Sequence, residues 1–250
     1  MALEGKRLSR VEVRRPDLRR PLPERFAERL EGRRIASFRR RAKYLLLGLD
    51  SDEDWLIHLG MSGRMLVGQG WPNELDAHDH VVIGAEDGTV VRFNDARRFG
   101  VMDLISAGET ETHPLIKDIG PEPLDAAFDG PALAARLKGK SAPIKAALLD
   151  QRVVAGIGNI YASEALFRAG ISPTRKSGTI QGERAEKLMA AVKAVLNEAI
   201  KAGGSSLRDH RQTSGELGYF QHNFKVYGKD GKPCPVCRRS EEHTSELQSR

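Results

Sequence analysis

Cysteine is nearly missing from this 250-residue chain. Its two cysteines, Cys234 and Cys237, share one C-x-x-C spacing in "GKPCPVC", and no second pair follows. A framework of disulfides is thereby excluded, and the composition suits a reducing cytoplasm. The C-x-x-C spacing is that of half a zinc site, which leaves open what supplies the other ligands.

Long apolar runs are also absent. No stretch approaches the roughly 18 apolar residues of a membrane span, and the first residues, "MALEGKRLSRVEVRR", lack the apolar region of a secretory signal. We therefore expect a cytoplasmic protein without a membrane partner. With 40% hydrophobic and 30% charged residues, the chain suits one large domain or two modest ones.

The chain has fewer acidic than basic residues. Its 40 Lys and Arg against 34 Asp and Glu give a net charge of +6. Many basic residues cluster within 6–43, in "GKR", "RRPDLRR", "EGRR" and "FRRRAK". A clustered basic face is the usual footprint of a protein that binds a phosphate backbone. A solvated basic surface explains the charge alone equally well.

The first half of the chain has the pattern of strands. The candidate segments are 7–15, 33–50, 54–67, 80–93 and 100–105. Within 80–93, Asp87-Gly88 suits the tight turn of a hairpin. A helix is expected at about 23–31. Many short strands joined by turns imply a sandwich or a barrel.

Helical spacing begins near Pro121. Helices are predicted within 121–140, 141–151 and 159–170, the last with Asn159 as N-cap and Gly170 as its end. The clearest helix follows 183, and its apolar stripe is Leu188, Val192, Val195, Leu196 and Ile200. Strands first and helices second predict two domains with a boundary near 110–125 and a ligand cleft between them.

Five ordered segments carry a specific likeness: "RRRAKYLLL" (39–47), "HLGMSG" (58–63), "NDARRFG" (94–100), "AGIGNIYASEALFRAGISP" (155–173) and "GYFQHNFKVYGKDGKPCPVC" (218–237). Together they resemble bacterial formamidopyrimidine-DNA glycosylases, which excise oxidised purines such as 8-oxoguanine. The likeness covers nearly the whole chain. It implies an α+β fold, with a two-sheet β-sandwich and flanking helices in 1–115 and a helical helix–two-turns–helix domain in 116–217.

The C-terminal segment departs from the family pattern. The resemblance implies a zinc finger with four cysteines, and Cys234 and Cys237 match its first ligand pair. Residues 218–239 then correspond to an incomplete zinc-finger hairpin, and 240–250, "SEEHTSELQSR", read as a non-native tail. Two thiols alone bind zinc poorly, so we expect the family's zinc to be missing from this chain.

The beginning of the chain departs from the pattern as well. Family members begin Met-Pro-Glu, and the proline exposed by removal of methionine is the amine that attacks the sugar, while the glutamate supplies protons. Here the likeness begins at "ALEGKRLSRVEV". We therefore expect this chain as written to lack both residues and to be inactive or weakly active.

Lys43 matches the family lysine assigned to β-elimination. With Leu45 and Leu47 it shares one face of the predicted strand, where an ammonium group is costly unless it faces a DNA cleft. From the residues alone, an ordinary strand-edge lysine is the better interpretation. The resemblance favours an active-site cation.

Met61, Arg97 and Phe99 match the family residues that fill the space left by a base flipped out of the duplex. A flexible thioether, a planar cation and an aromatic ring suit that task, and the arginine can bond to the orphaned partner base. Taken singly, these are ordinary residues of a turn and a hairpin. Ala96 stands where the family usually has proline.

Further positions match family contacts to DNA or the lesion, namely His58, His78, Lys140, Lys145, Asn159 and Tyr227. Each alone is an unremarkable surface residue. Asn159 opens a helix whose free N–H groups can face a phosphate, although it is equally well a simple N-cap. Segment 205–220 resembles the family's mobile loop, which closes over the extruded base.

Three functions compete. The resemblance implies a monomeric, bifunctional DNA glycosylase and abasic-site lyase of base excision repair, acting on double-stranded DNA. The alternative is a catalytically dead remnant that binds damaged DNA. A third possibility is an RNA- or ribosome-associated protein, since such proteins also use helix–two-turns–helix modules. The motifs in 39–47, 58–63 and 94–100 argue against it.

Overall fold

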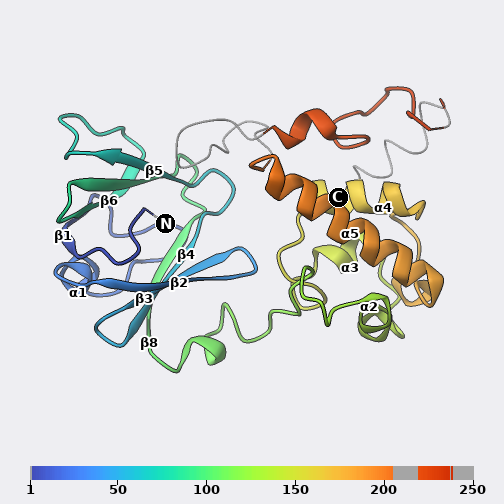
Figure 1. Ribbon diagram of the computed structural model, residues 1–250, viewed down its shortest axis with the longest axis horizontal. Coiled ribbons are helices and arrows are strands. Elements are labelled where there is room, and N and C mark those ends of the chain that lie inside the picture. The colour runs from blue at the N-terminus through green and yellow to red at the C-terminus, as the bar shows by residue number, and fades with distance from the viewer. Residues whose placement is uncertain (1, 205–218, 237, 239–250) are drawn as a thin grey trace. The chain divides into compact units, whose positions relative to one another are not determined.

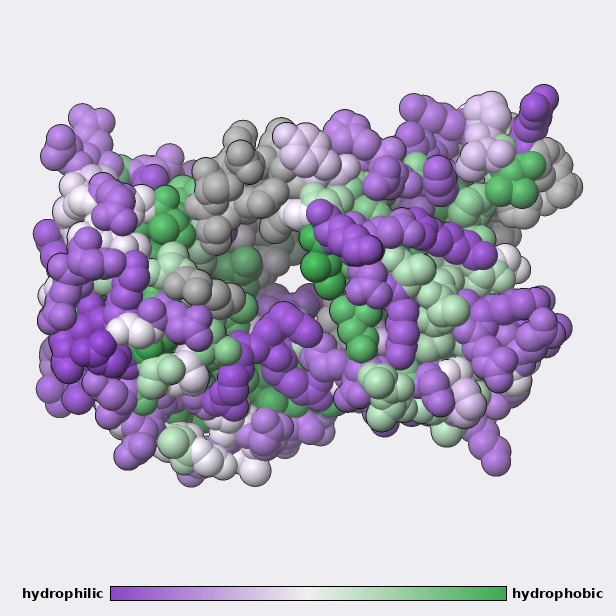
Figure 2. Space-filling model, viewed as in Figure 1, coloured by the Kyte–Doolittle hydropathy of each residue, from purple (hydrophilic) through white to green (hydrophobic). Residues whose placement is uncertain are grey.

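The computed structural model describes residues 2–204, 219–236 and 238 (Figure 1). The described chain divides into two compact units, one of residues up to Lys117 and one that starts at Asp118 and includes 219–236. Each unit has its own apolar core. Hydrophilic residues cover most of the face drawn in Figure 2.

The first unit contains two four-stranded antiparallel sheets, which confirms the predicted α+β fold with a two-sheet sandwich. One sheet has the order β1 (Leu8–Val13), β6 (Asp79–Ala85), β7 (Thr89–Asn94) and β5 (Arg64–Gln69). The other has the order β2 (Ile35–Arg41), β3 (Tyr44–Leu49), β4 (Glu53–His58) and β8 (Val101–Ser106).

Apolar side chains from both sheets form one core in this unit. Ile83 and Phe93 come from the first sheet, and Leu47 and Trp55 from the second, and each is at most 1% exposed. Burial of each such side chain stabilises the fold by roughly 1.5–3 kcal/mol. The predicted helix is the short α1 (Phe26–Leu30), whose Phe26 meets Trp55 edge to face at 6.1 Å between ring centroids. The 3₁₀ turn η1 (Thr110–Thr112) follows β8.

Two predicted strands are in fact pairs of strands. Segment 33–50 is the β2–β3 hairpin, and its two-residue turn is Ala42-Lys43. The prediction that Lys43 lies on a strand face was therefore wrong. Segment 54–67 is divided between β4 and β5, which belong to different sheets, so residues 59–63 form a loop from one sheet to the other.

The second unit is helical. Its helices are α2 (Gly130–Leu137), α3 (Ile144–Leu149), α4 (Asn159–Ala169) and α5 (Glu183–Lys201), with 3₁₀ turns η2 (Ser177–Thr179) and η3 (Phe220–Asn223). In α5 the predicted stripe is buried at Leu188, Val192 and Val195. Ile200 is 65% exposed, so its assignment to the core was wrong.

Helix α4 differs from its prediction at one end. Its N-cap is Gly158 rather than Asn159, which is the first residue of the helix. Its C-cap is Gly170 in the left-handed conformation, as predicted. In the part of the chain that the structure describes, no helix has the length and apolarity needed to cross a membrane.

Candidate functional site

Lys43 projects from the turn of the β2–β3 hairpin in the first unit. The residue before it, Ala42, has a φ of 52°, a conformation that costs an L-residue roughly 1–2 kcal/mol. The Lys43 side chain is exposed, yet the surrounding protein partly desolvates its ammonium and lowers its pKa. A lysine with a lowered pKa is easier to deprotonate near neutral pH, as a catalytic amine requires.

His58, at the end of β4, lies beside this lysine. Burial lowers the pKa of His58 most, and the charges of Lys43 and Arg19 lower it further. Its Nδ1 accepts a hydrogen bond from the Gly60 N–H at 3.0 Å. The neutral ring therefore carries its proton on Nε2, where it can donate to an anionic oxygen.

Loop 59–63 packs against loop 96–100, and the two are called the paired loops below. Gly60 has a φ of +68°, and a Cβ placed on it would lie 2.5 Å from the backbone of Phe99. The first glycine of "HLGMSG" is therefore required by both conformation and close approach. The loops are joined through Asp95, which accepts hydrogen bonds from the Ser62 hydroxyl at 2.5 Å and the Gly100 N–H at 2.8 Å.

The structure brings three predicted residues together on these loops. Met61 is 68% exposed and Phe99 is 39% exposed. The guanidinium carbon of Arg97 lies 4.6 Å from the centroid of the Phe99 ring, within cation–π range. A thioether, a guanidinium and a phenyl ring thus stand on two adjoining loops, and their contact with DNA stays a prediction.

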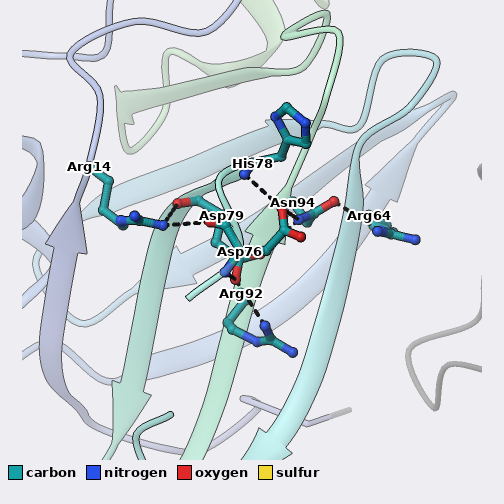
Figure 3. A network of polar contacts seen from close by, with 7 residues as sticks. All are labelled: Arg14, Arg64, Asp76, His78, Asp79, Arg92 and Asn94. Atoms are coloured by element: carbon teal, nitrogen blue, oxygen red, sulfur yellow. Dashed lines mark hydrogen bonds and ion pairs between the residues drawn. The ribbon is translucent and has the colours of Figure 1, made fainter. Parts of the chain in front are cut away.

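His78 is held at the surface of the same unit by a polar network (Figure 3). Its N–H donates to Asp76 Oδ1 at 2.7 Å, and Asn94 Nδ2 bonds to Asp76 and to the fully buried Asp79 at 3.1 and 2.9 Å. Arg92 neutralises Asp79 at 2.9 Å. Figure 3 shows the imidazole of His78 turned away from the carboxylates, and its ring lies edge to face with that of His80 at 6.3 Å between centroids.

In the second unit, the predicted cations Lys140 and Lys145 differ in environment. Lys145 on α3 is 4% exposed, and burial lowers its pKa. Lys140 is exposed and lines a surface pocket of about 360 Å³ with Arg136, Asp150 and Arg152. Arg152 is paired with Asp150 through both carboxylate oxygens at 3.0 Å, so the positive charge of Lys140 and Arg136 is in excess and the pocket suits an anionic group. Sequence reasoning missed Arg136 and Arg152, which no motif distinguishes from other surface arginines.

Tyr227 is positioned by a buried acid that sequence reasoning also missed. Glu164 on α4 is fully buried, and its carboxylate accepts the N–H groups of Lys225, Val226 and Tyr227 at 2.9, 3.0 and 2.9 Å. It thereby ties the segment that carries Tyr227 to the helix that begins at Asn159. The signal in the sequence was an acid flanked by the small residues of "ASEAL".

The metal ligands predicted from the C-x-x-C spacing are only partly visible. Cys234 is 2% exposed with a free thiol, while Cys237, segment 205–218 and the tail 239–250 lie outside the described residues. Among the described residues, no group of three or more His, Cys, Asp and Glu side chains can hold a metal ion. Those residues do not by themselves fit zinc. The incomplete zinc-finger hairpin and the expected lack of zinc both stay predictions.

Comparisons with known proteins match both units of this fold. Sequence models for the N-terminal domain and the H2TH domain of formamidopyrimidine-DNA glycosylase match residues 1–102 and 119–211. The formamidopyrimidine-DNA glycosylase of Cereibacter sphaeroides is 56% identical over 246 residues, which cover 95% of this chain and 87% of that protein. The one from Paracoccus denitrificans is 55% identical and covers 94% and 85%.

Solved structures of formamidopyrimidine-DNA glycosylases also align with most of this chain. MutM (Fpg) from Thermus thermophilus aligns with a TM-score of 0.82 and 41% identity over 95% of this chain and 86% of its own. Fpg (MutM) from Lactococcus lactis, in a complex with DNA that contains Fapy-dG, aligns with a TM-score of 0.85 and 31% identity over 95% and 87%. With both domains matched over most of its length, this chain belongs to the formamidopyrimidine-DNA glycosylase family.

Proposed function

We propose that this protein acts on double-stranded DNA in base excision repair, as a glycosylase that excises oxidised purines and as a lyase at the resulting abasic site. Its relatives are formamidopyrimidine-DNA glycosylases. Related structures contain DNA with Fapy-dG, with carbocyclic 8-oxo-G or with an abasic site. The substrates proposed are therefore 8-oxoguanine and formamidopyrimidine lesions.

The observation that carries this proposal is the pairing of loops 59–63 and 96–100. An enzyme that reacts with a base inside a duplex must rotate it out of the stack, which costs a few kcal/mol and leaves a gap. Met61 and Phe99 offer exposed apolar surface to fill that gap. Arg97, stacked on Phe99, offers hydrogen-bond donors to the base left without a partner.

The chemistry proposed for the first unit centres on Lys43. The proposed chemistry requires an amine that attacks the sugar C1′, displaces the base and forms an iminium, which makes the C2′ proton acidic and opens the way to β-elimination. The family's proline amine is not among the residues of the sequence as written, so the trapping experiment below must identify the residue that attacks. Lys43, with its lowered pKa, is the group proposed to handle protons in that elimination. His58 is proposed to donate from Nε2 to a nearby phosphate oxygen.

The second unit is proposed to hold the phosphate backbone. Lys140 supplies positive charge at the surface, and Lys145 adds its charge from a buried position. Asn159, the exposed first residue of α4, begins a helix whose first N–H groups can face a phosphate. Tyr227, fixed through Glu164, supplies a further contact. These contacts recognise the backbone rather than the sequence of the DNA, as suits an enzyme that must act anywhere in a genome.

Borohydride trapping tests the proposal. The protein is mixed with an 8-oxoguanine duplex, an abasic duplex or an undamaged duplex, reduced, and examined for a covalent adduct whose attached residue is mapped by mass spectrometry. An adduct restricted to damaged DNA supports the glycosylase and lyase. Selective binding of damaged DNA without an adduct supports the binding protein instead, and equal binding of damaged and undamaged DNA contradicts both.

A further inference from the structure

Asp95 is the first residue after β7 and is fully buried. Its Oδ1 accepts the hydrogen bond from the Ser62 hydroxyl at 2.5 Å, and its Oδ2 accepts the one from the Gly100 N–H at 2.8 Å. One carboxylate therefore fastens loop 59–63 to the end of loop 96–100. Hydrogen bonds to a charged acceptor are roughly twice as strong as those between neutral groups.

The main chain of Asp95 extends this connection to a third segment. Its N–H donates to the carbonyl of His78 at 3.0 Å, and its own carbonyl bonds to His80 Nε2 at 2.8 Å. The same carbonyl accepts the Arg98 N–H at 3.2 Å. A single residue is thus bonded to both paired loops and to segment 78–80.

The surrounding residues fit a carboxylate at this position. The Ser62 oxygen accepts the Arg97 N–H at 3.2 Å, which directs the hydroxyl proton toward Asp95. A Cβ on Gly100 would lie 2.5 Å from the Phe93 ring and 3.1 Å from Asp95 Oδ2, so only glycine lets the loop close onto the acid. An asparagine amide has one acceptor oxygen for two converging donors.

We propose that Asp95 is a positioning residue for base displacement, which holds Met61, Arg97 and Phe99 together as one preformed plug. The inference rests on the function proposed above. Without the carboxylate the two loops move independently, and their side chains lose conformational freedom at the moment of binding. The loss of freedom lowers the affinity for DNA into which the plug inserts. The affinity for DNA bound only through its backbone is unchanged.

The test uses three variants, Asp95→Ala, Asp95→Asn and Ser62→Ala, with Asp54→Ala as the matched control. Asp54 is likewise a buried carboxylate of the first unit, 6% exposed, and it accepts hydrogen bonds from Arg39 and from the Thr110 hydroxyl, both at 2.5 Å. It lies near the start of β4, at the other end of that strand from loop 59–63.

Two duplexes serve as probes. One carries a tetrahydrofuran abasic analogue opposite 2-aminopurine, and the other is its undamaged counterpart. The ratio of the two affinities reports discrimination, the emission of 2-aminopurine reports displacement of the orphaned base, and the melting temperature reports stability. These readouts separate the positioning role from a loss of folding.

We expect Asp95→Ala to lower the affinity ratio roughly tenfold and to abolish most of the emission change, because both loop-closing bonds are lost. Ser62→Ala, which removes one bond, and Asp95→Asn should lower the ratio by a smaller factor. Asp54→Ala should lower the melting temperature and preserve both the ratio and the emission change.

A ratio and emission at the wild-type level in Asp95→Ala overturn the proposal. If Asp95→Ala does not fold, the same result in Ser62→Ala overturns it. Equal losses in Asp54→Ala also overturn it, because any lost buried carboxylate then has the same effect. A wild-type protein that binds the two duplexes equally contradicts the proposed function itself.

Discussion

Tyr44 and His58 are cross-strand partners on β3 and β4, with ring centroids 4.8 Å apart. Burial raises the pKa of the Tyr44 phenol, against a smaller opposite effect of Arg20 and Arg19. Burial also lowers the pKa of the His58 imidazole, and the positive charges of Lys43 and Arg19 lower it further. Both rings are therefore kept neutral at neutral pH, and the charged groups that shift their pKa values, Lys43, Arg19 and Arg20, are cations.

The shift at His58 predicts a dependence of stability on pH. Because the pKa of His58 in the folded protein is below its ordinary value of 6.5, the unfolded chain binds more protons between those two values. The stability associated with neutral His58 is present above pH 6.5 and is lost as the pH falls through the folded-state pKa. Urea midpoints measured between about pH 7 and pH 5 should therefore vary less in His58→Gln than in the wild type.

His222→Gln is the control for this experiment, since His222 is exposed in the second unit. It should retain the wild-type dependence of the urea midpoint on pH. A His58→Gln curve parallel to the wild type would show that the imidazole is not desolvated in the folded protein.

Replacing Gly60 or Gly32 by alanine should destabilise the fold to different degrees, because only one of the two glycines closely approaches another backbone segment. Both have positive φ, +68° and +75°, but only at Gly60 would a Cβ meet backbone atoms, those of Phe99 at 2.5 Å. Gly32→Ala should cost roughly 1–2 kcal/mol for its left-handed conformation. Gly60→Ala should cost roughly 1–3 kcal/mol more, because the paired loops must separate. Chemical unfolding measures both, and equal costs would mean that the loops are not in contact.

Much of the fold was predictable because it depends on local patterns. Alternation and the Asp87-Gly88 turn indicated the sheets, and the helical stripe indicated α5. The turn at Ala42 was missed because an alanine carries no signal for positive φ. Ile200 was assigned to the core because it continues the apolar stripe of α5, and periodicity alone cannot show that the last turn of a helix is exposed.

The site was predictable only where a motif marked it. The segments around Met61 and Arg97 were recognisable, but their contact depends on β4 and β5 belonging to different sheets, which no local pattern encodes. Asp95 and Glu164 were missed for a related reason. Their donors, such as Ser62 and Val226, are distant in sequence, so the buried carboxylates look like ordinary surface acids until the fold is known.

We expect a large loss of stability when the side chain of Glu164 is removed. Glu164→Ala leaves three backbone N–H groups at residues 225–227 without their acceptor, which should cost roughly 3–5 kcal/mol. Those three amides should also exchange with deuterium faster than in the wild type. Glu198→Ala is the matched control on α5, because its two bonds to Arg168 lie at the surface and should contribute at most about 1 kcal/mol. Similar losses in the two variants would contradict the anchoring role of Glu164.

Met61 and Ile200 provide a matched pair for the proposed insertion into DNA. They are 68% and 65% exposed, so replacing either by alanine should change the unfolding free energy by less than about 0.5 kcal/mol. Met61→Ala removes apolar surface from the paired loops, and we expect its preference for a tetrahydrofuran-containing duplex over undamaged DNA to fall roughly tenfold, which corresponds to about 1.4 kcal/mol. Ile200→Ala should leave that preference unchanged, as measured by fluorescence anisotropy at fixed salt. If both variants kept the wild-type preference, the exposed thioether would have no part in displacing the base, and the gap would have to be filled by Arg97 and Phe99 alone.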